Sequence, residues 1–302
     1  MVKVRVPGKV NLALAVGPVR ADGYHELGTV FQAVSLFDEL TALPAARGEF
    51  RLSLQGEGAD VLPADEDNLA MRAARLLAAH ATEEVGVAIQ VRKRIPVAGG
   101  MAGGSADAAA ALVACNELWQ LGLSQPQLHD LARQLGADVP FLLHGGTAIG
   151  TDRGDRIESV AARGRCHWVL ALSHHGLATP AVFREFDRAA SPGPAVISPE
   201  LLAALETGDV ARVGGLLRND LQEPAIRLLP ELGEVLDEGR DAGALGALVS
   251  GSGPTAAFLC SDADQAAALG RRLVGIAEVR EVQIVHGPVP GAQIIAEEVA
   301  HG

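Results

Sequence analysis

The sequence predicts two domains, each of the α+β class. The chain has 302 residues, enough for one large domain or two of ordinary size. Strand-like and helix-like patterns are mixed in each half, and 48% of the residues are hydrophobic, which is enough to build a core. The composition becomes charged and loop-like around 155–165, so we place the domains at 1–158 and 159–302.

Strand patterns dominate the beginning of the first half. Valines alternate with Lys3 and Arg5 over the first six residues, which is the two-residue period of a half-exposed strand. Similar patterns predict three further strands, at 10–16, 28–36 and 49–56.

The rest of the first half alternates between helix and strand. The pattern predicts a helix over 68–81 with Asp67 or Asn68 near its start, and a strand over 85–95. Helices are predicted next, at about 105–121 and 126–135, and the chain then returns to strand within 136–155.

The second half begins with a buried-type strand over 166–173. A helix over 178–187 is predicted, with Thr179 as its N-cap and Pro180 at its first position. The remaining predicted elements are helices within 198–242, two strands about a glycine turn in 245–260, a helix over 262–273 and a closing strand over 279–287.

Charge and cysteine content exclude several classes of protein. The net charge of −12 argues against nucleic acid as a partner. Cys115, Cys166 and Cys260 are too few and too widely spaced for a disulfide scaffold or a zinc site, so we expect a cytoplasmic protein. We expect no signal peptide, because no apolar h-region follows the N-terminus, and no membrane span, because no apolar run reaches about 18 residues.

The sequence "PVAGGMAGGSADAAAAL" at 96–112 places four glycines directly before a helix. It matches neither the Rossmann fingerprint nor the Walker A loop, which needs a lysine before its hydroxyl residue. Two interpretations remain from the residues alone. The glycines form a tight turn, or their N–H groups and the helix N-terminus cradle a phosphate, with Ser105 as N-cap or phosphate ligand.

This stretch closely resembles the phosphate-binding motif of the GHMP small-molecule kinase superfamily. "VPGKVNLALAVGPVRADGYHEL" near the N-terminus and "VSGSGPTAAF" near the C-terminus match in the same order. The combination of Lys9, Asn11 and "RADGYHEL" resembles the branch that phosphorylates 4-diphosphocytidyl-2-C-methyl-D-erythritol in the non-mevalonate isoprenoid pathway. "GADVPFLLHGGTAIGTDRGD", "DEDNLAMRAARLL" and "RNDLQEPA" also resemble that branch, so the resemblance spans nearly the whole chain.

The resemblance implies a two-domain GHMP kinase fold. Its N-terminal domain is like ribosomal protein S5 domain 2 and its C-terminal domain is ferredoxin-like. It also implies ATP as co-substrate with Mg²⁺, a cytidine diphosphate-linked polyol as acceptor, and a monomer or homodimer. The implied ATP-binding residues are Asn68, Pro96, Val97, Ala98, Gly99, Gly100, Met101, Ala102, Gly103, Gly104, Ser105 and Ala106.

Asp138 and Lys9 are the predicted catalytic residues. An aspartate before Val-Pro often caps the next segment, and an isolated lysine is normally solvated. The resemblance instead places both in the active site. There Asp138 would accept or orient the hydroxyl proton, and Lys9 would offset charge on the transferred phosphoryl group.

Tyr24 and His25 are the predicted cytosine-binding residues, by the same resemblance. An aromatic face can stack on a base and a histidine can bond its edge. Phe183 is the candidate for the opposite face of the base, although an ordinary helix-core position is equally open. Asn11 and Thr179 complete the predicted substrate site, and Thr179 caps its helix, contacts substrate, or does both.

Three smaller features complete the predictions. Many relatives carry two hydroxyl residues after the glycines, whereas here Ala106 and Asp107 follow Ser105. Asp107 either helps to place Mg²⁺ or complements the helix dipole, and we favour the dipole; the metal ligands stay unknown. "RKR" at 92–94 is a solvated strand end or an attractor of the nucleotide, and "RGD" at 153–155 is taken as chance.

Overall fold

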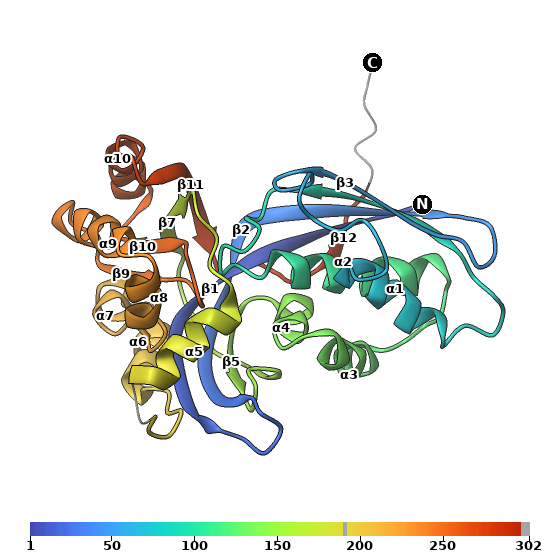
Figure 1. The fold of residues 1–302 in the computed structure, drawn as a ribbon, viewed down its shortest axis with the longest axis horizontal. Helices are drawn as coiled ribbons and strands as arrows, with labels where there is room; N and C mark the ends of the chain where they lie inside the picture. The colour runs from blue at the N-terminus through green and yellow to red at the C-terminus, as the bar shows by residue number, and fades with distance from the viewer. Residues whose placement is uncertain (190–191, 297–302) are drawn as a thin grey trace.

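The computed structural model describes residues 1–189 and 192–296, which form two lobes (Figure 1). Eight strands make the first sheet, with the path β12-β1-β2-β4-β3; β5 joins β2 and β6, and β8 joins β1. These strands are β1 (Val2–Val19), β2 (His25–Pro44), β3 (Phe50–Gly56), β4 (Val87–Lys93), β5 (Thr147–Thr151), β6 (Arg156–Ser159), β8 (Arg218–Asn219) and β12 (Gln293–Ile294).

Four helices pack together on one face of this sheet (Figure 1). Six of the ten buried residues of the central helix, α2 (Gly103–Leu118), are alanine, which lets this helix lie close to both the sheet and its neighbours. The helices are α1 (Leu69–Ala78), α2 (Gly103–Leu118), α3 (Gln125–Leu135) and α4 (Val139–His144).

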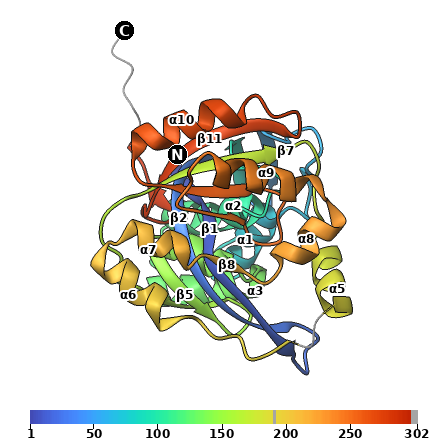
Figure 2. The same cartoon turned by 90° about the vertical axis from the view of Figure 1, so that its left-hand side faces the viewer.

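The second lobe is built on a four-stranded antiparallel sheet in the order β11-β7-β10-β9. Its strands are β7 (Cys166–Ser173), β9 (Gly246–Val249), β10 (Ala256–Cys260) and β11 (Val279–Gly287). Helices α9 and α10 lie in front of this sheet in Figure 2 and contact its strands. The helices of this half are α5 (Thr179–Ala189), α6 (Pro199–Thr207), α7 (Val210–Gly215), α8 (Gln222–Leu228), α9 (Glu231–Asp241) and α10 (Ala263–Leu273).

The α+β class and most predicted elements are confirmed, with several differences. Strand β2 extends beyond the predicted 28–36, and β6 lies in the stretch that was expected to be a loop around 155–165. The strands expected at 2–6 and 10–16 are one strand, β1, because a register shift between Pro7 and Gly8 keeps the pairing with β2 across the proline. Helix α4 was not predicted, since its run of apolar residues has no helical period. Helix α2 begins at Gly103, so Ser105 is its third residue and not its N-cap.

The long strands β1 and β2 extend from the first lobe into the second. Leu14 and Val16 of β1 belong to the second hydrophobic cluster, together with Val169 and Phe258. The division at residue 158 stays a prediction, and β8 and β12, which lie beyond it, pair with β1 in the first sheet. No helix in the described ranges, 1–189 and 192–296, is long and apolar enough to cross a membrane.

A buried ion-pair cluster ties the start of α2 to the first sheet. Lys93 Nζ lies 2.5 Å from Asp38 Oδ2 and 2.6 Å from Asp107 Oδ2, and it also donates to the Gly103 carbonyl at 3.2 Å. All three side chains are at most 4% exposed. Asp38 Oδ1 accepts the N–H groups of residues 94 and 95, so the cluster also holds the chain that enters the glycine run.

The cluster changes two sequence predictions. Lys93, in the middle of "RKR", is buried, whereas Arg92 and Arg94 on either side are exposed, as expected of a solvated strand end. Asp107 does not complement the helix dipole, because it is the fifth residue of α2 and its partner is Lys93. Burial, together with the nearby Asp38 carboxylate, raises the pKa of Asp107 to about 7 even though Lys93 opposes the shift.

Lys93→Met should destabilise the protein by about 3–5 kcal/mol, because it leaves two buried carboxylates without their cation. Urea unfolding at pH 8 measures the free energy of unfolding. Lys3→Met is the control, since Lys3 pairs with Glu39 at a partly exposed position. Equal stabilities of the two variants would contradict the importance of the cluster.

Asp107→Asn should flatten the pH dependence of stability. The folded protein retains a proton on Asp107 that the unfolded chain releases, because the pKa rises from 3.8 to about 7 on folding. This contribution is present at low pH and is lost as the pH rises through 7. From pH 5 to pH 8 the wild type should therefore lose more free energy of unfolding than the variant; Asp130→Asn, on the exposed side of α3, should keep the wild-type slope.

Candidate active site

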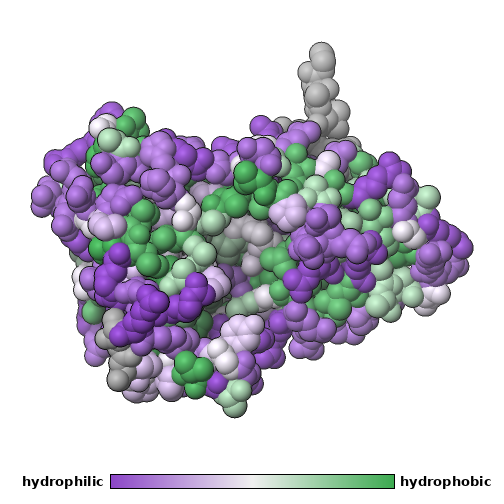
Figure 3. Space-filling model, in the orientation of Figure 1, coloured by the Kyte–Doolittle hydropathy of each residue, from purple (hydrophilic) through white to green (hydrophobic). Residues whose placement is uncertain are grey.

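A cavity of about 1110 Å³ lies between the two lobes, where the surface is hollowed (Figure 3). It is lined from the first lobe by β1, β2 and the glycine run, and from the second by the start of α5 and the turn after β9. All but three of the predicted site residues line it: Lys9, Asn11, Tyr24, His25, Pro96, Val97, Ala98, Gly99, Gly100, Ala102, Gly103, Gly104, Ser105, Asp138, Thr179 and Phe183.

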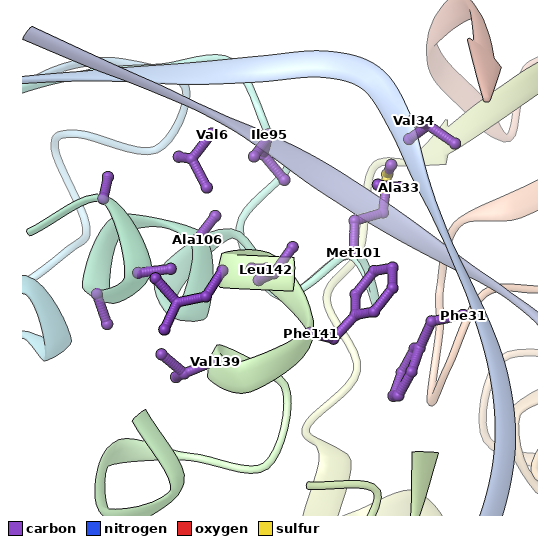
Figure 4. Packing of buried hydrophobic residues seen from close by; sticks show 14 of the residues in the cluster. Val6, Phe31, Ala33, Val34, Ile95, Met101, Ala106, Val139, Phe141 and Leu142 are labelled. Atoms are coloured by element: carbon purple, nitrogen blue, oxygen red, sulfur yellow. The ribbon is translucent and has the colours of Figure 1, made fainter. Parts of the chain in front are cut away.

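Asn68, Met101 and Ala106 do not line the cavity. Met101 is fully buried, and Figure 4 shows it among core residues that include Phe31 and Phe141. Ala106 is also fully buried. Both polar atoms of the Asn68 side-chain amide form hydrogen bonds, since the oxygen accepts from the Ala70 N–H at 3.0 Å and the nitrogen donates to a backbone carbonyl. Of the two residues expected near the start of this helix, Asn68 is the N-cap of α1, and its neighbour Leu69 lines the cavity instead.

The glycine run is a tightly packed loop that ends on the N-terminus of α2. Gly100 has a φ of 76°, and a Cβ there would lie 2.0 Å from the Ser250 carbonyl oxygen. Ala102, the N-cap, is also left-handed, with a φ of 61° and no side-chain cap. The first-turn N–H groups of α2 have no partner within the helix and meet the cavity at residues 103–105, which suits an anion.

Lys9 enters the cavity from β1 and is only 4% exposed. Its Nζ donates to Asn11 Oδ1 at 2.7 Å and to the Gly100 carbonyl at 2.8 Å. An ammonium group has three donors, so one is left for a ligand. Burial lowers the pKa of Lys9, whereas the Asp138 carboxylate works against that shift.

Asn11 is oriented by a chain of hydrogen bonds that the sequence did not reveal. Its Nδ2 donates to Thr29 Oγ1 at 2.8 Å, and that hydroxyl donates to the Ala13 carbonyl at 2.8 Å. The chain fixes the Asn11 amide so that its oxygen faces Lys9. Thr29 also lines the cavity, and only the pairing of β1 with β2 brings it there.

Asp138 precedes α4 and faces the cavity with its side chain half-buried. The carboxylate caps no N–H group of α4, so the capping role is not observed. Ser105 lies next to this loop, since a Cβ on Gly136 would be 3.9 Å from Ser105 Oγ. The cavity therefore brings together a carboxylate, a buried lysine and the free N-terminus of α2.

An aromatic group lines the other end of the cavity. The His25 and Phe183 rings are stacked, with centroids 5.3 Å apart. His25 Nδ1 bonds the Gly17 carbonyl at 2.8 Å and Nε2 faces Asp187 at 3.1 Å, so both ring nitrogens are engaged. A base edge could bond the ring only if Asp187 moved away. Tyr24 is 59% exposed, and its ring can contact a planar ligand that enters the cavity.

Thr179 joins two segments of the second lobe at the cavity. Its hydroxyl lies 2.8 Å from that of Ser252, in the glycine turn that follows β9. Helix α5 starts at Thr179 itself, and the Ala178 carbonyl accepts the first helical N–H groups. The predicted N-cap position is therefore off by one residue, and the Thr179 side chain belongs to the cavity wall.

Two family models match the chain. They are the GHMP kinases N terminal domain, over residues 68–146, and the GHMP kinases C terminal domain, over residues 201–276. The chain is 54% identical to the 4-diphosphocytidyl-2-C-methyl-D-erythritol kinase of Mycolicibacterium smegmatis, over 97% of this chain and 92% of that one. It is also 54% identical to that of Thermobifida fusca, over 97% and 98% of the two chains.

Solved structures agree with these matches. A crystal structure of 4-(cytidine 5'-diphospho)-2C-methyl-D-erythritol kinase superposes with a TM-score of 0.77 at 37% identity, covering 94% of this chain and 98% of that one. A homoserine kinase from Cytophaga hutchinsonii, at 19% identity and a TM-score of 0.75 over 97% of both chains, shares the fold. The chain has a two-domain GHMP kinase fold and belongs to the GHMP kinase family.

Proposed function

We propose that this enzyme transfers a phosphoryl group from ATP to the 2-hydroxyl of 4-diphosphocytidyl-2-C-methyl-D-erythritol, as a step in isoprenoid precursor synthesis. The main support is that two groups of residues line one cavity. One end carries Lys9, Asp138 and the N-terminus of α2, and the other end carries Tyr24, His25 and Phe183. Relatives that bear this enzyme name match almost the full length of the chain.

ATP binds with its phosphates over the glycine run. The left-handed backbone at Gly100 and Ala102 turns the chain so that the first-turn amides of α2 point into the cavity. Fixed N–H groups and the positive end of the helix suit a triphosphate. Leu62, Leu69 and Arg72 line the cavity near α1 and form the candidate wall for the adenine.

Mg²⁺ accompanies the nucleotide. No group of three or more His, Cys, Asp or Glu side chains that could hold a metal occurs in the described parts of the chain. The triphosphate itself would therefore supply most of the ligands, with Ser105 and Asp138 as the nearby polar side chains. The bound ion neutralises charge on the transferred phosphoryl group.

Asp138 accepts or orients the proton of the acceptor hydroxyl, and Lys9 stabilises charge on the phosphoryl group. Asp138 suits this role because its carboxylate is not used as a helix cap and faces the cavity. Asn11 and Gly100 hold the Lys9 ammonium group through two hydrogen bonds. Its remaining N–H donor is therefore oriented before the reaction, and no side-chain conformational entropy is lost in the transition state.

Tyr24, His25 and Phe183 bind the cytosine ring. The stacked pair of His25 and Phe183 forms one wall, and the exposed Tyr24 ring can close on the base from its other face. Asn11 and Thr179 line the cavity between this group and the glycine run and orient the polyol. The cytoplasmic location and the monomeric or homodimeric state stay predictions.

The main alternative is a kinase acting on homoserine or mevalonate, whose solved relatives share the fold at 13–20% identity. Those acceptors carry no cytosine. Inhibition of phosphoryl transfer by CDP, in competition with the acceptor, would therefore support the cytidine-linked acceptor and argue against homoserine or mevalonate. A non-catalytic regulator on this fold would bind ATP but turn over no acceptor.

Asp138→Asn should reduce turnover by about 10²-fold or more, because it removes the general base. Release of ADP with ATP, Mg²⁺ and the diphosphocytidyl acceptor measures turnover, and substrate affinity should change little. Asp130→Asn, an exposed aspartate in α3, is the matched control and should be fully active. Near wild-type turnover in Asp138→Asn would eliminate its role.

Tyr24→Ala should weaken binding of cytidine by about 1–3 kcal/mol, the value of one base–aromatic stack. Calorimetric titration with cytidine measures the loss. Tyr24→Phe keeps the ring and should retain most of the affinity. Unchanged binding in Tyr24→Ala would contradict the stacking role, and ATP binding should be the same in all three proteins.

A further inference from the structure

Two arginines on the cavity wall share one buried carboxylate. Arg133 Nε, from α3, and Arg153 Nη2, from the β5–β6 turn, each lie 3.2 Å from Asp155 Oδ2. The Asp155 side chain is 1% exposed, whereas those of Arg133 and Arg153 are 41% and 34% exposed. Both guanidinium groups line the cavity and remain reachable from it.

The three groups leave an uncompensated positive charge in a chain whose net charge is −12. Burial alone would raise the pKa of Asp155, but the hydrogen bonds from Arg153 and Arg133 outweigh it and hold that pKa below its ordinary value. Asp155 is therefore ionised at neutral pH and neutralises one arginine. Among the described residues, no second carboxylate pairs with these two arginines, so one positive charge is left uncompensated at the cavity wall.

The arginine pair lies along the path that the proposed acceptor must follow. The Arg153 guanidinium stands over the Tyr24 ring, 5.3 Å from its centroid, at the cytosine end. Arg133 is near the end of α3, just before the loop that carries Asp138 at the transfer end. An acceptor with its base at Tyr24 and its hydroxyl at Asp138 places its diphosphate between these points.

The turn that carries Arg153 is fastened to the hairpin that carries Tyr24. Arg20 pairs with Asp152, and the Asp152 carbonyl accepts the Leu27 N–H at 2.7 Å. Gly154 has a φ of 86°, which lets the turn reverse and bring Arg153 next to Asp155. The triplet "RGD" at 153–155 therefore forms an ordered turn beside the cavity.

We propose that Arg133 and Arg153 bind the diphosphate of the acceptor and that Asp155 holds them in place. This inference rests on the proposed function. The planar guanidinium fork suits phosphate oxygens, and two such groups on one carboxylate are already oriented before the ligand arrives. The pair gives the enzyme its preference for a nucleoside diphosphate-linked acceptor over a bare cytidine.

Calorimetric titration of cytidine, CDP and a non-hydrolysable ATP analogue into the full-length protein tests this role. Arg153→Gln and Arg133→Gln should each weaken CDP binding by about tenfold and leave cytidine and the ATP analogue within about twofold. The CDP affinity of both variants should also depend less on salt. Arg156→Gln is the control, because Arg156 is exposed on the same hairpin and does not line the cavity.

The other possible results contradict the proposal, and each can be told from the rest. Unchanged CDP binding in both variants would show that Arg133 and Arg153 do not bind the diphosphate. An equal loss for cytidine and CDP means that the arginines only support Tyr24, and a loss for the ATP analogue alone assigns them to the ATP phosphates. If the wild type binds the ATP analogue but neither cytidine nor CDP, the proposed acceptor fails together with the pair. Unchanged melting temperatures show that the variants are folded.

Discussion

The buried contact of Lys93 with Asp38 and Asp107 is the constraint on which the site depends. It lies under the glycine run and joins β4, β2 and α2 within one cluster. A loop with so many glycines has little stiffness of its own, so its amides can be fixed only by what holds its two ends. Asp38 holds the entry through two backbone N–H groups, and Lys93 holds the exit through the Gly103 carbonyl.

The glycine run is also where the two lobes meet. The Gly100 carbonyl accepts from Lys9 Nζ at 2.8 Å and from Ser250 Oγ at 3.2 Å, and a Cβ on Gly100 would collide with the Ser250 carbonyl. The Thr255 N–H donates to the Gly99 carbonyl. The glycine run, the buried lysine and the turn after β9 therefore form one packed unit, held by backbone and side-chain hydrogen bonds together.

Much of the fold could be predicted from local patterns, and most of the site from the resemblance to the GHMP kinases. Alternation and helical period located most elements, and the cap at Asn68 follows from its side-chain chemistry. Other features could not be predicted, because they depend on partners distant in sequence. Lys93 is buried only because Asp107 and Asp38 surround it, and Thr29 reaches Asn11 only through the register of β1 and β2. Helix α4 was missed because its five consecutive apolar residues show no helical period.

The sequence by itself determined the α+β class and the glycine run before α2, since both follow from composition and short spacing. The resemblance of its motifs to the GHMP kinases indicated most of the residues that gather in the cavity. Only the tertiary structure decided which of them reach it. Met101 turns into the core, Ala106 and Asn68 face away, and Arg133 and Arg153 meet on Asp155. Side-chain direction depends on packing and on strand register, and long-range contacts set both.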